Sequence, residues 1–480
     1  MTKIAWMLLI HDIAPSFMKR LKATQTRCFK KWLGYCKTGN NSIFYRSNEH
    51  HGLQLKEMGS WHKQCRLIRR HILSTSKDPQ VQKIHAMVAA EQKKSQSKAW
   101  SDCKELENLK FAVLHEKMRG PVKKSGTGLG WGSSLHKALA AEKEERQAIL
   151  RMFKEITEEE RIVSVITNLK QFGEWVKWEA VMQVDKRWHS LLACQSDAQM
   201  QFRLCAIEDV LPTDSLLQLW GQGDGFCPLC SHLGLMRKGS LQHILCGCEH
   251  CLKEKPQSRI TWRHDSVLFA IFRSVLSVVS RFKKARAEGK LKGSTETAGA
   301  ISFKSESNTV WAAPRVPELT ELLAKAPDWK LMFDIDSPKH GQSKEPPFPA
   351  EILAGVSKIP DGLIWSVSSK TLIWVELTSP WEENMTTWHT TKRSKYNQLK
   401  IDCEDRGWKV HPLYVEVGCR GHVSQSFHYM CKVLGFMKGE VADLKYTVER
   451  TALHCSHAIF VFRHRREWEP RALLDVSEWN

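Results

Sequence analysis

The chain has 480 residues, with 72 Lys and Arg against 52 Asp and Glu, and a formal net charge of +20. A hydrophobic content of 42% and 19 tryptophans predict two or three folded domains and exclude wholesale disorder. The charge indicates a polyanionic partner, for which nucleic acid is the default, and the absence of an apolar run of about 18 residues argues against a membrane. Fifteen scattered cysteines without an export signal favour a reducing intracellular compartment in which some thiols bind metal.

The N-terminal half predicts helices. Residues 1–120 carry basic clusters at 30–32 and 66–71, and residues 136–220 return to a helical pattern with a charged, solvated segment. Between them, residues 120–135 are rich in glycine. They lack the strand and the GxxxxGK[ST] pattern of a phosphate loop, so we interpret this stretch as a connector.

Residues 227–248 carry a metal-binding pattern, C-x2-C-x12-H-x4-C, made by Cys227, Cys230, His243 and Cys248. A tight turn supplying two thiolates and a helix supplying the rest would suit a tetrahedral Zn²⁺. Neighbouring residues leave the fourth ligand open: Cys246, Cys251, His232 and His250. The alternative is a group of reduced cysteines in a small core. Because nothing nearby resembles a general base, we expect a closed, structural zinc site.

Residues 262–284 predict one amphipathic helix. Its expected apolar face consists of Val267, Leu268, Ile271, Phe272, Val275, Leu276, Val279 and Phe282. The helix starts with Trp262-Arg263-His264-Asp265. Asp265 in the first turn would suit the helix dipole. Alternatively, Arg263 and His264 contact DNA phosphate or help to orient an active site.

After a polar segment at 285–312, which predicts a flexible linker, an α/β unit is expected at about 315–437. Strands are predicted near 360–367, 371–378 and 410–417. In the final forty residues, HAIFVF predicts a further strand, followed by a polar tail.

The first two of these strands predict a hairpin with Ser368 and Ser369 at its tip, which makes Asp361 and Glu376 cross-strand neighbours on one face. Two such carboxylates can hold a divalent cation, Mg²⁺ or Mn²⁺, and so activate a water against a phosphodiester. The alternative is that Asp361 caps a turn and Glu376 is exposed.

A helix is predicted from Ser379 to about Arg406, with Pro380 first and Glu382 completing a capping box. Its expected apolar face consists of Met385, Trp388, Leu399 and Cys403. Lys392 interrupts this face and must snorkel or pair with an acid, for which the hairpin carboxylates are candidates.

The segments that carry a family resemblance are, in chain order, KKWLGYCK (30–37), SKDPQV (76–81), LCAIEDVLPTDSLLQLWG (204–221), CPLC…LQHILCGC, TWRHDSVL, DWKLMFDID (328–336), IPDGLIWS, VELTSPWEE, KRSKY and VEVGCRG (415–421). Their order resembles the C-terminal half of proteins encoded by non-LTR retrotransposons that carry a restriction-enzyme-like endonuclease. Those proteins run from a reverse transcriptase through a thumb and helical linker to a CCHC zinc knuckle, an (R/K)HD motif and a PD-(D/E)xK-type nuclease. In that nuclease the lysine has moved from the strand to the next helix.

The resemblance implies a multidomain α and α/β protein. Its parts would be a thumb-like and post-polymerase helical region (1–120), a helical linker (121–220), the zinc knuckle (221–255), the RHD amphipathic helix (256–284), a flexible linker (285–312), the restriction-endonuclease-like domain (313–440) and a C-terminal tail (441–480). The chain departs from the family in three ways. The loop between Cys230 and His243 is longer, Thr378 stands where a strand lysine would be, and no YxDD polymerase motif occurs. By itself the chain is therefore not a reverse transcriptase.

Two functions follow from these features. The first is a zinc-containing DNA-binding protein with an endonuclease, in which Asp361 and Glu376 bind Mg²⁺ or Mn²⁺ and Lys392, or alternatively Lys395, orients the nucleophile. The resemblance implies nicking of duplex DNA to prime reverse transcription, and a chromosomal substrate implies a nuclear location. The second is a catalytically inactive remnant or domesticated fragment that binds DNA or RNA without cutting it.

Overall fold

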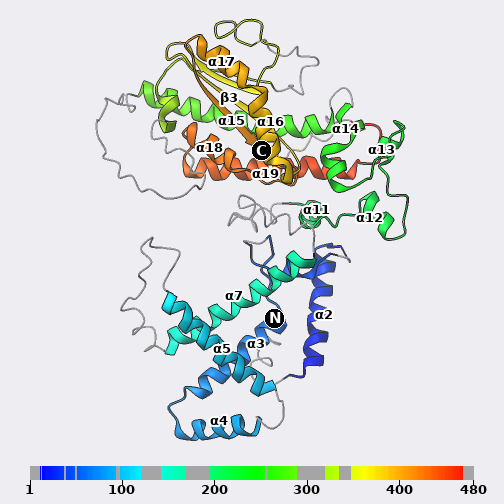
Figure 1. Cartoon of the computed structure of the whole chain (residues 1–480), viewed down its shortest axis with the longest axis vertical. Helices are drawn as coiled ribbons and strands as arrows, with labels where there is room; N and C mark the ends of the chain where they lie inside the picture. The colour runs from blue at the N-terminus through cyan, green and yellow to red at the C-terminus, as the bar shows by residue number, and fades with distance from the viewer. Residues whose placement is uncertain are drawn as a thin grey trace. The chain divides into compact units, whose positions relative to one another are not determined.

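The computed structural model describes residues 11, 13–36, 39–48, 51–92, 98–119, 142–168, 195–253, 258–288, 319–334 and 348–468. The chain forms two units (Figure 1), residues 1–173 with 184–189 and residues 174–183 with 190–480. Three expectations fall wholly or mainly outside the described residues: the connector at 120–135, the linker at 285–312 and the polar end of the tail. None of the described helices combines the length and apolar character needed to cross a bilayer.

The first unit is helical in its described parts, as the sequence predicts for this half of the chain. Its elements are α2 (Pro15–Trp32), η1 (Asn41–Phe44), α3 (Met58–Ser74), α4 (Pro79–Gln92), α5 (Lys98–Arg119) and α7 (Glu142–Asn168). Helices α3, α5 and α7 share a small apolar core made of Leu67, Leu106, Leu109, Ile149 and Phe153. An ion pair between Arg66 of α3 and Asp102 of α5 lies beside this core.

The second unit contains a mixed four-stranded sheet in the order β1–β2–β3–β4. The strands are β1 (Lys330–Phe333), β2 (Gly362–Ser366), β3 (Thr371–Thr378) and β4 (Lys409–Glu416). The first three are antiparallel neighbours, and β4 runs parallel to β3. Gly362 pairs with Val375, so the register predicted for the hairpin is confirmed and Asp361 lies opposite Glu376. Strand β1 was not predicted.

Gly362 begins β2 and pairs with Phe333 of β1. A Cβ atom at this position would lie 2.5 Å from the Phe333 ring of the neighbouring strand β1. Because real Cβ atoms do not approach so closely, a side chain at position 362 would force the Phe333 ring to move, and glycine avoids this.

Helices cover both faces of the sheet. On one face lie α15 (Arg259–Ala287), α18 (Gln425–Val433) and α19 (Lys438–Val461), and Figure 1 shows α15 and α19 side by side. On the other face lie α16 (Met385–Lys395) and α17 (Asn397–Asp405). Along β3, Val375 and Leu377 join the core beneath α15, whereas Trp374 joins the core beneath α17. Because side chains alternate along a strand, Glu376 faces the side of α16 and α17.

The remaining described elements of this unit are short: α11 (Asp197–Ile207), α12 (Asp214–Leu219), α13 (Pro228–Ser231), η3 (His243–Gly247), α14 (Glu249–Lys253), η4 (Leu319–Ala324) and η5 (Glu382–Asn384). They connect the larger elements and build the metal-binding segment. The fold class, α together with α/β, therefore agrees with the sequence prediction.

The helix predicted from Ser379 to Arg406 is divided into η5, α16 and α17, so its predicted start is wrong. The Glu382 carboxylate accepts hydrogen bonds from Arg420 N at 2.6 Å and Nε at 2.7 Å instead of capping the helix. Helix α16 ends at Lys395 and is followed by the C-cap residue Tyr396, whose buried hydroxyl donates to Ile359 O at 3.0 Å. Trp388 is 43% exposed and does not belong to the buried face. The other three expected face residues are buried: Met385, Leu399 and Cys403.

Helix α15 starts three residues earlier than predicted, because Ser258 caps it by accepting a hydrogen bond from Thr261 N. Asp265 therefore lies beyond the first turn, and the helix-dipole explanation for this residue is wrong. Most of the predicted apolar face is buried, but Leu276 is exposed and Val278 is buried instead.

Residues 438–461 form helix α19, so the strand predicted from HAIFVF is wrong. Buried residues recur along it at helical spacing: Val448, Ala452, Cys455 and Ile459. Packing against α15 thus outweighs the local preference of β-branched and aromatic residues for strands.

Replacement of Ile459 by Ala should lower the free energy of unfolding by about 2–5 kcal/mol, because this fully buried side chain would leave a cavity. The matched control is Val461→Ala on the same helix, where the side chain is 51% exposed and little should change. Urea denaturation of both variants measures the difference. Equal stability of the two would contradict a packed α19.

Candidate functional site

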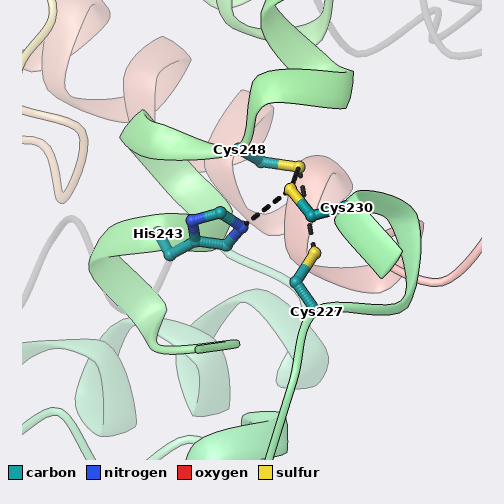
Figure 2. A group of neighbouring side chains, drawn as sticks. All are labelled: Cys227, Cys230, His243 and Cys248. Atoms are coloured by element: carbon teal, nitrogen blue, oxygen red, sulfur yellow. Dashed lines mark hydrogen bonds between the residues drawn. The ribbon is translucent and has the colours of Figure 1, made fainter. Parts of the chain in front are cut away.

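The predicted metal ligands come together in the second unit. Figure 2 shows the side chains of Cys227, Cys230, His243 and Cys248 pointing toward one another, and their ligand atoms all lie within 4.8 Å. The Sγ atoms of Cys230 and Cys248 are 3.7 Å apart, and those of Cys227 and Cys248 are 3.9 Å apart. His243 Nε2 lies 3.4 Å from Cys230 Sγ.

These distances match a tetrahedral zinc site. With Zn–S bonds of about 2.3 Å and Zn–N bonds of about 2.0–2.1 Å, tetrahedral geometry places two sulfurs about 3.8 Å apart and a sulfur and a nitrogen about 3.5 Å apart. Cys248 completes the group, which answers the question of the fourth ligand that the sequence leaves open. The cluster can therefore bind a metal such as zinc.

The backbone around the cluster is held by short contacts. Cys227 N donates to Arg237 O at 2.7 Å, and Leu235 N donates to Cys230 O at 3.0 Å, which closes the turn that carries the first two thiols. His243 begins the π-helical turn η3, and Cys248 follows its end. The thiol contact with Cys248, together with burial, raises the pKa of Cys227 to about 12. A cation is therefore needed if these thiols are to become thiolates at neutral pH.

The two hairpin carboxylates meet at the start of β2. Asp361 N donates to Glu376 Oε2 at 3.2 Å, and Leu377 N donates to Asp361 Oδ2 at 2.7 Å. Glu376 is almost fully buried, so the reading in which it is simply exposed is wrong. The Asp361 side chain remains 19% exposed, which gives the pair an opening to solvent.

Lys392 of α16 reaches this pair, as its position on the predicted apolar face suggested. Its ammonium donates to Glu376 Oε1 and is 19% exposed. Lys395 Nζ lies 3.8 Å from the same oxygen and donates to Tyr396 Oη at 2.7 Å. The geometry thus favours Lys392 over Lys395 as the partner of Glu376.

His264 of α15 completes the cluster. Its Nε2 lies 3.3 Å from Asp361 Oδ2 and 3.2 Å from Leu377 O, and its Nδ1 lies 3.0 Å from Asp265 Oδ1. Both ring nitrogens therefore face oxygen acceptors, as a protonated imidazolium requires. Of the two roles that the sequence offers for this histidine, the structure favours orientation of the site over direct contact with phosphate.

The charges of the cluster depend on one another. Although burial acts to raise it, the charges of His264 and Lys392 lower the pKa of Asp361. Burial and the neighbouring Asp361 raise the pKa of Glu376, against the opposing charge of Lys392. Although burial acts to lower it, the two aspartates beside His264 raise its pKa to about 10. Asp361 is therefore ionised and His264 is protonated at neutral pH.

Arg263 does not have the predicted role in binding phosphate, because it is completely buried. Its guanidinium donates to Ser379 O at 3.0 Å and Oγ at 3.2 Å, and to Ser456 Oγ at 3.2 Å. It also lies 3.8 Å from Cys246 Sγ, next to the zinc ligands. Arg263 is thus a structural cross-link, and no sequence signal marks Ser456 as its partner.

The carboxylate cluster offers fewer ligands than the zinc site. Within the described part of the chain, the Cys/His group is the one set of three or more metal-binding side chains whose ligand atoms all lie within 4.8 Å. At the hairpin, Asp361 and Glu376 supply carboxylate oxygens and Leu377 supplies a carbonyl, which are oxygen ligands of the kind that Mg²⁺ uses together with water and phosphate. The donors fit such an ion in their chemistry.

Neither a comparison with known protein families nor one with curated proteins finds a match to this chain. The resemblance to retrotransposon proteins therefore rests on the order of the sequence motifs alone.

Purified protein should contain one zinc per chain, and Cys248→Ser should lose it, because the fourth ligand is removed. The control is Cys251→Ser, a buried neighbour outside the ligand group, which should retain the metal. Elemental mass spectrometry of the three proteins gives the ratio. Zinc loss in the control alone would assign the fourth ligand to Cys251.

His264 should also give a pH signature in protein without added divalent cation. Its folded pKa of about 10 lies above the ordinary value of about 6.5, so its charged form stabilises the fold. This contribution is complete below about pH 6.5 and is lost as the pH rises toward 10. The difference in unfolding free energy between wild type and His264→Asn should therefore shrink over that range. An NMR titration showing an imidazole pKa near 6.5 would contradict the assigned contacts.

Proposed function

We propose that this chain is a retrotransposon-derived, zinc-containing nucleic-acid-binding protein whose second unit hydrolyses phosphodiester bonds in DNA with a divalent metal. The observation that carries the proposal is the meeting of Asp361, Glu376 and Lys392, from two strands and the following helix. Two carboxylates at the edge of a sheet, with an ammonium group from the next helix beside them, are the set of residues expected of a nuclease whose lysine lies on the helix.

The chemistry assigns a role to each residue. Asp361 and Glu376 would hold Mg²⁺ or Mn²⁺, which when bound polarises the phosphate and lowers the pKa of a coordinated water. The Lys392 ammonium lies on Glu376 Oε1, where it can orient the attacking water and stabilise negative charge on the phosphorane. Its partial exposure lets it reach a phosphate that enters from solvent.

His264 would hold Asp361 in position until substrate and metal arrive. Its imidazolium bridges Asp361 Oδ2 and Leu377 O, the two oxygens that a cation would also use. The imidazolium therefore supplies positive charge beside these two oxygens, which stabilises the ionised form of Asp361.

The Cys/His segment supports the same proposal, because a zinc knuckle would supply a nucleic-acid-binding element. This segment is connected through Arg263 to the strand that carries Glu376. Arg263 joins η3 to the end of β3, and the next residue is His264. The family resemblance adds nicking of one duplex strand and a nuclear site of action to the proposal.

Asp361→Ala should reduce Mn²⁺-dependent plasmid nicking by on the order of 10²-fold or more, since it removes a ligand of the metal. Lys392→Ala should cause a loss of similar order, because it removes the charge beside Glu376. Lys395→Ala should have a smaller effect, because its ammonium donates to Tyr396. Gel separation of nicked and supercoiled plasmid measures all three.

The matched control is Asp402→Ala, which removes a partly exposed carboxylate whose described partner is Gln398 on the same helix. It should nick as wild type does. If wild type and Asp361→Ala nick equally, or if neither nicks while both bind DNA, the catalytic assignment is wrong and the inactive, nucleic-acid-binding alternative is favoured.

A further inference from the structure

The first unit carries a basic stripe that the nuclease proposal does not use. In α2, the dark blue helix of Figure 1, Lys19, Lys22, Arg27, Lys30 and Lys31 recur along one side of the helix. From Lys19 to Lys31 the stripe is about 18 Å long at 1.5 Å per residue. The helix contains no Asp or Glu. The stripe is therefore linear and of one sign.

This stripe lines a hollow of about 820 Å³. Its other lining residues are Ala23, Thr26, Gly34, Tyr35 and Asn41. Thr26 and Tyr35 are buried, so the base of the hollow is formed by side chains that are packed in the protein interior. Because water occupies about 30 Å³ per molecule in the liquid, this space holds far more than one small anion. It suits a repeating ligand that lies along the helix.

The positive charge of the stripe is only partly neutralised. Lys22 pairs with Glu57, which also pairs with Arg161 Nη2 at 2.5 Å. Although burial acts to raise it, these partners lower the pKa of Glu57, so it is ionised. Lys30 donates to Gly39 O at 3.0 Å. In contrast, no ion pair joins the exposed Lys19, Arg27 or Lys31 to another residue within the described part of the chain.

The backbone at the end of the stripe leaves room for close approach. Gly34 lines the hollow just past α2 with a φ of 58°, where a side chain would be strained. Asn41 adds an exposed amide at the rim. Both features suit hydrogen bonding to a ligand with many oxygen atoms.

A membrane surface fits the helix less well. A helix that lies in the bilayer interface needs an apolar face that is available to lipid. In α2, Phe29 is buried against the rings of Phe44 and Tyr45. The exposed apolar side chains, Phe17 and Trp32, lie at opposite ends of the helix with Thr24 and Gln25 between them, so they do not form one continuous apolar face.

The second basic cluster noted in the sequence, at 66–71, offers no comparable surface. Arg66 pairs with Asp102, and Arg70 and His71 are buried. Only the cluster at 30–32 contributes to the hollow, through Lys30 and Lys31. The stripe on α2 is thus distinguished from the general positive charge of the chain.

From these observations we infer a second nucleic-acid site, in which the α2 stripe holds the phosphodiester backbone of one strand. A strand of B-form duplex presents one phosphate for about every 3.4 Å of duplex axis, so a stripe of this length can contact several successive phosphates. Base-independent contacts by lysine and arginine give salt-dependent binding without sequence preference. The inference concerns the first unit alone and stands whether or not the second unit cuts DNA.

The test is a charge reversal of the exposed residues in the full-length chain, Lys19→Glu/Arg27→Glu/Lys31→Glu. Fluorescence anisotropy without added divalent cation measures its affinity for labelled single-stranded RNA, single-stranded DNA and duplex DNA. We expect the dissociation constant to rise at least about tenfold at moderate salt, and the slope of log affinity against log salt to fall by about 2, for three lost phosphate contacts. The probe with the largest change identifies RNA or DNA as the ligand.

The matched control is Lys83→Glu/Lys154→Glu/Lys432→Glu, which makes the same change in net charge at exposed positions away from the hollow. It should bind nearly as wild type, and circular dichroism checks that both variants fold. Equal weakening in the two variants, unchanged binding by the α2 variant, or no binding by wild type would overturn the inference. A parallel measurement uses anionic lipid vesicles as the probe. Weaker binding of the α2 variant to the vesicles, with unchanged binding to all three nucleic acids, would also overturn the inference. A failed nicking assay with intact binding would overturn only the nuclease proposal.

Discussion

One buried guanidinium connects the parts of the second unit on which both candidate sites depend. Arg263 of α15 contacts the turn between the candidate metal ligands through Cys246, the end of β3 through Ser379 and the C-terminal part of α19 through Ser456. Removing such a charge from water is costly unless its hydrogen bonds are satisfied, so these elements must stay in their observed positions. The bonds also fix the rotation of α15, and that rotation directs His264, the next residue, toward Asp361.

The two candidate sites were predictable where the signal was local. Ligand spacing identifies the Cys/His cluster, and strand alternation with a two-serine tip fixes the hairpin register that pairs Asp361 with Glu376. Lys392 occupies a position where the helical pattern requires an apolar residue, and the acidic partner predicted from this is Glu376. What the sequence could not show depends on distant packing: the burial of Arg263, the helical state of 438–461 and the exposure of Trp388. Local propensity carries no information about which distant element will cover a segment.

Charge follows the same division between local pattern and tertiary context. The net charge of +20 predicts a polyanionic partner but does not say which basic residues meet it. Folding turns part of the cluster at 66–71 inward, where Arg66 serves an ion pair with Asp102. It leaves Lys19, Arg27 and Lys31 facing solvent along α2. Two similar basic clusters in the sequence thus have different roles: the one in α3 stabilises the packing of helices, whereas the one in α2 remains on the surface.

The packing of Gly362 beneath Phe333 separates two kinds of constraint on neighbouring residues. Under the proposed function the Asp361 carboxylate would bind the metal, whereas the missing side chain at Gly362 lets two strands pair. A lineage that abandons cutting but still needs the folded unit would lose the aspartate and keep the glycine. A lineage released from all constraint would lose both at similar rates. This dipeptide therefore separates the loss of an activity from the loss of a fold.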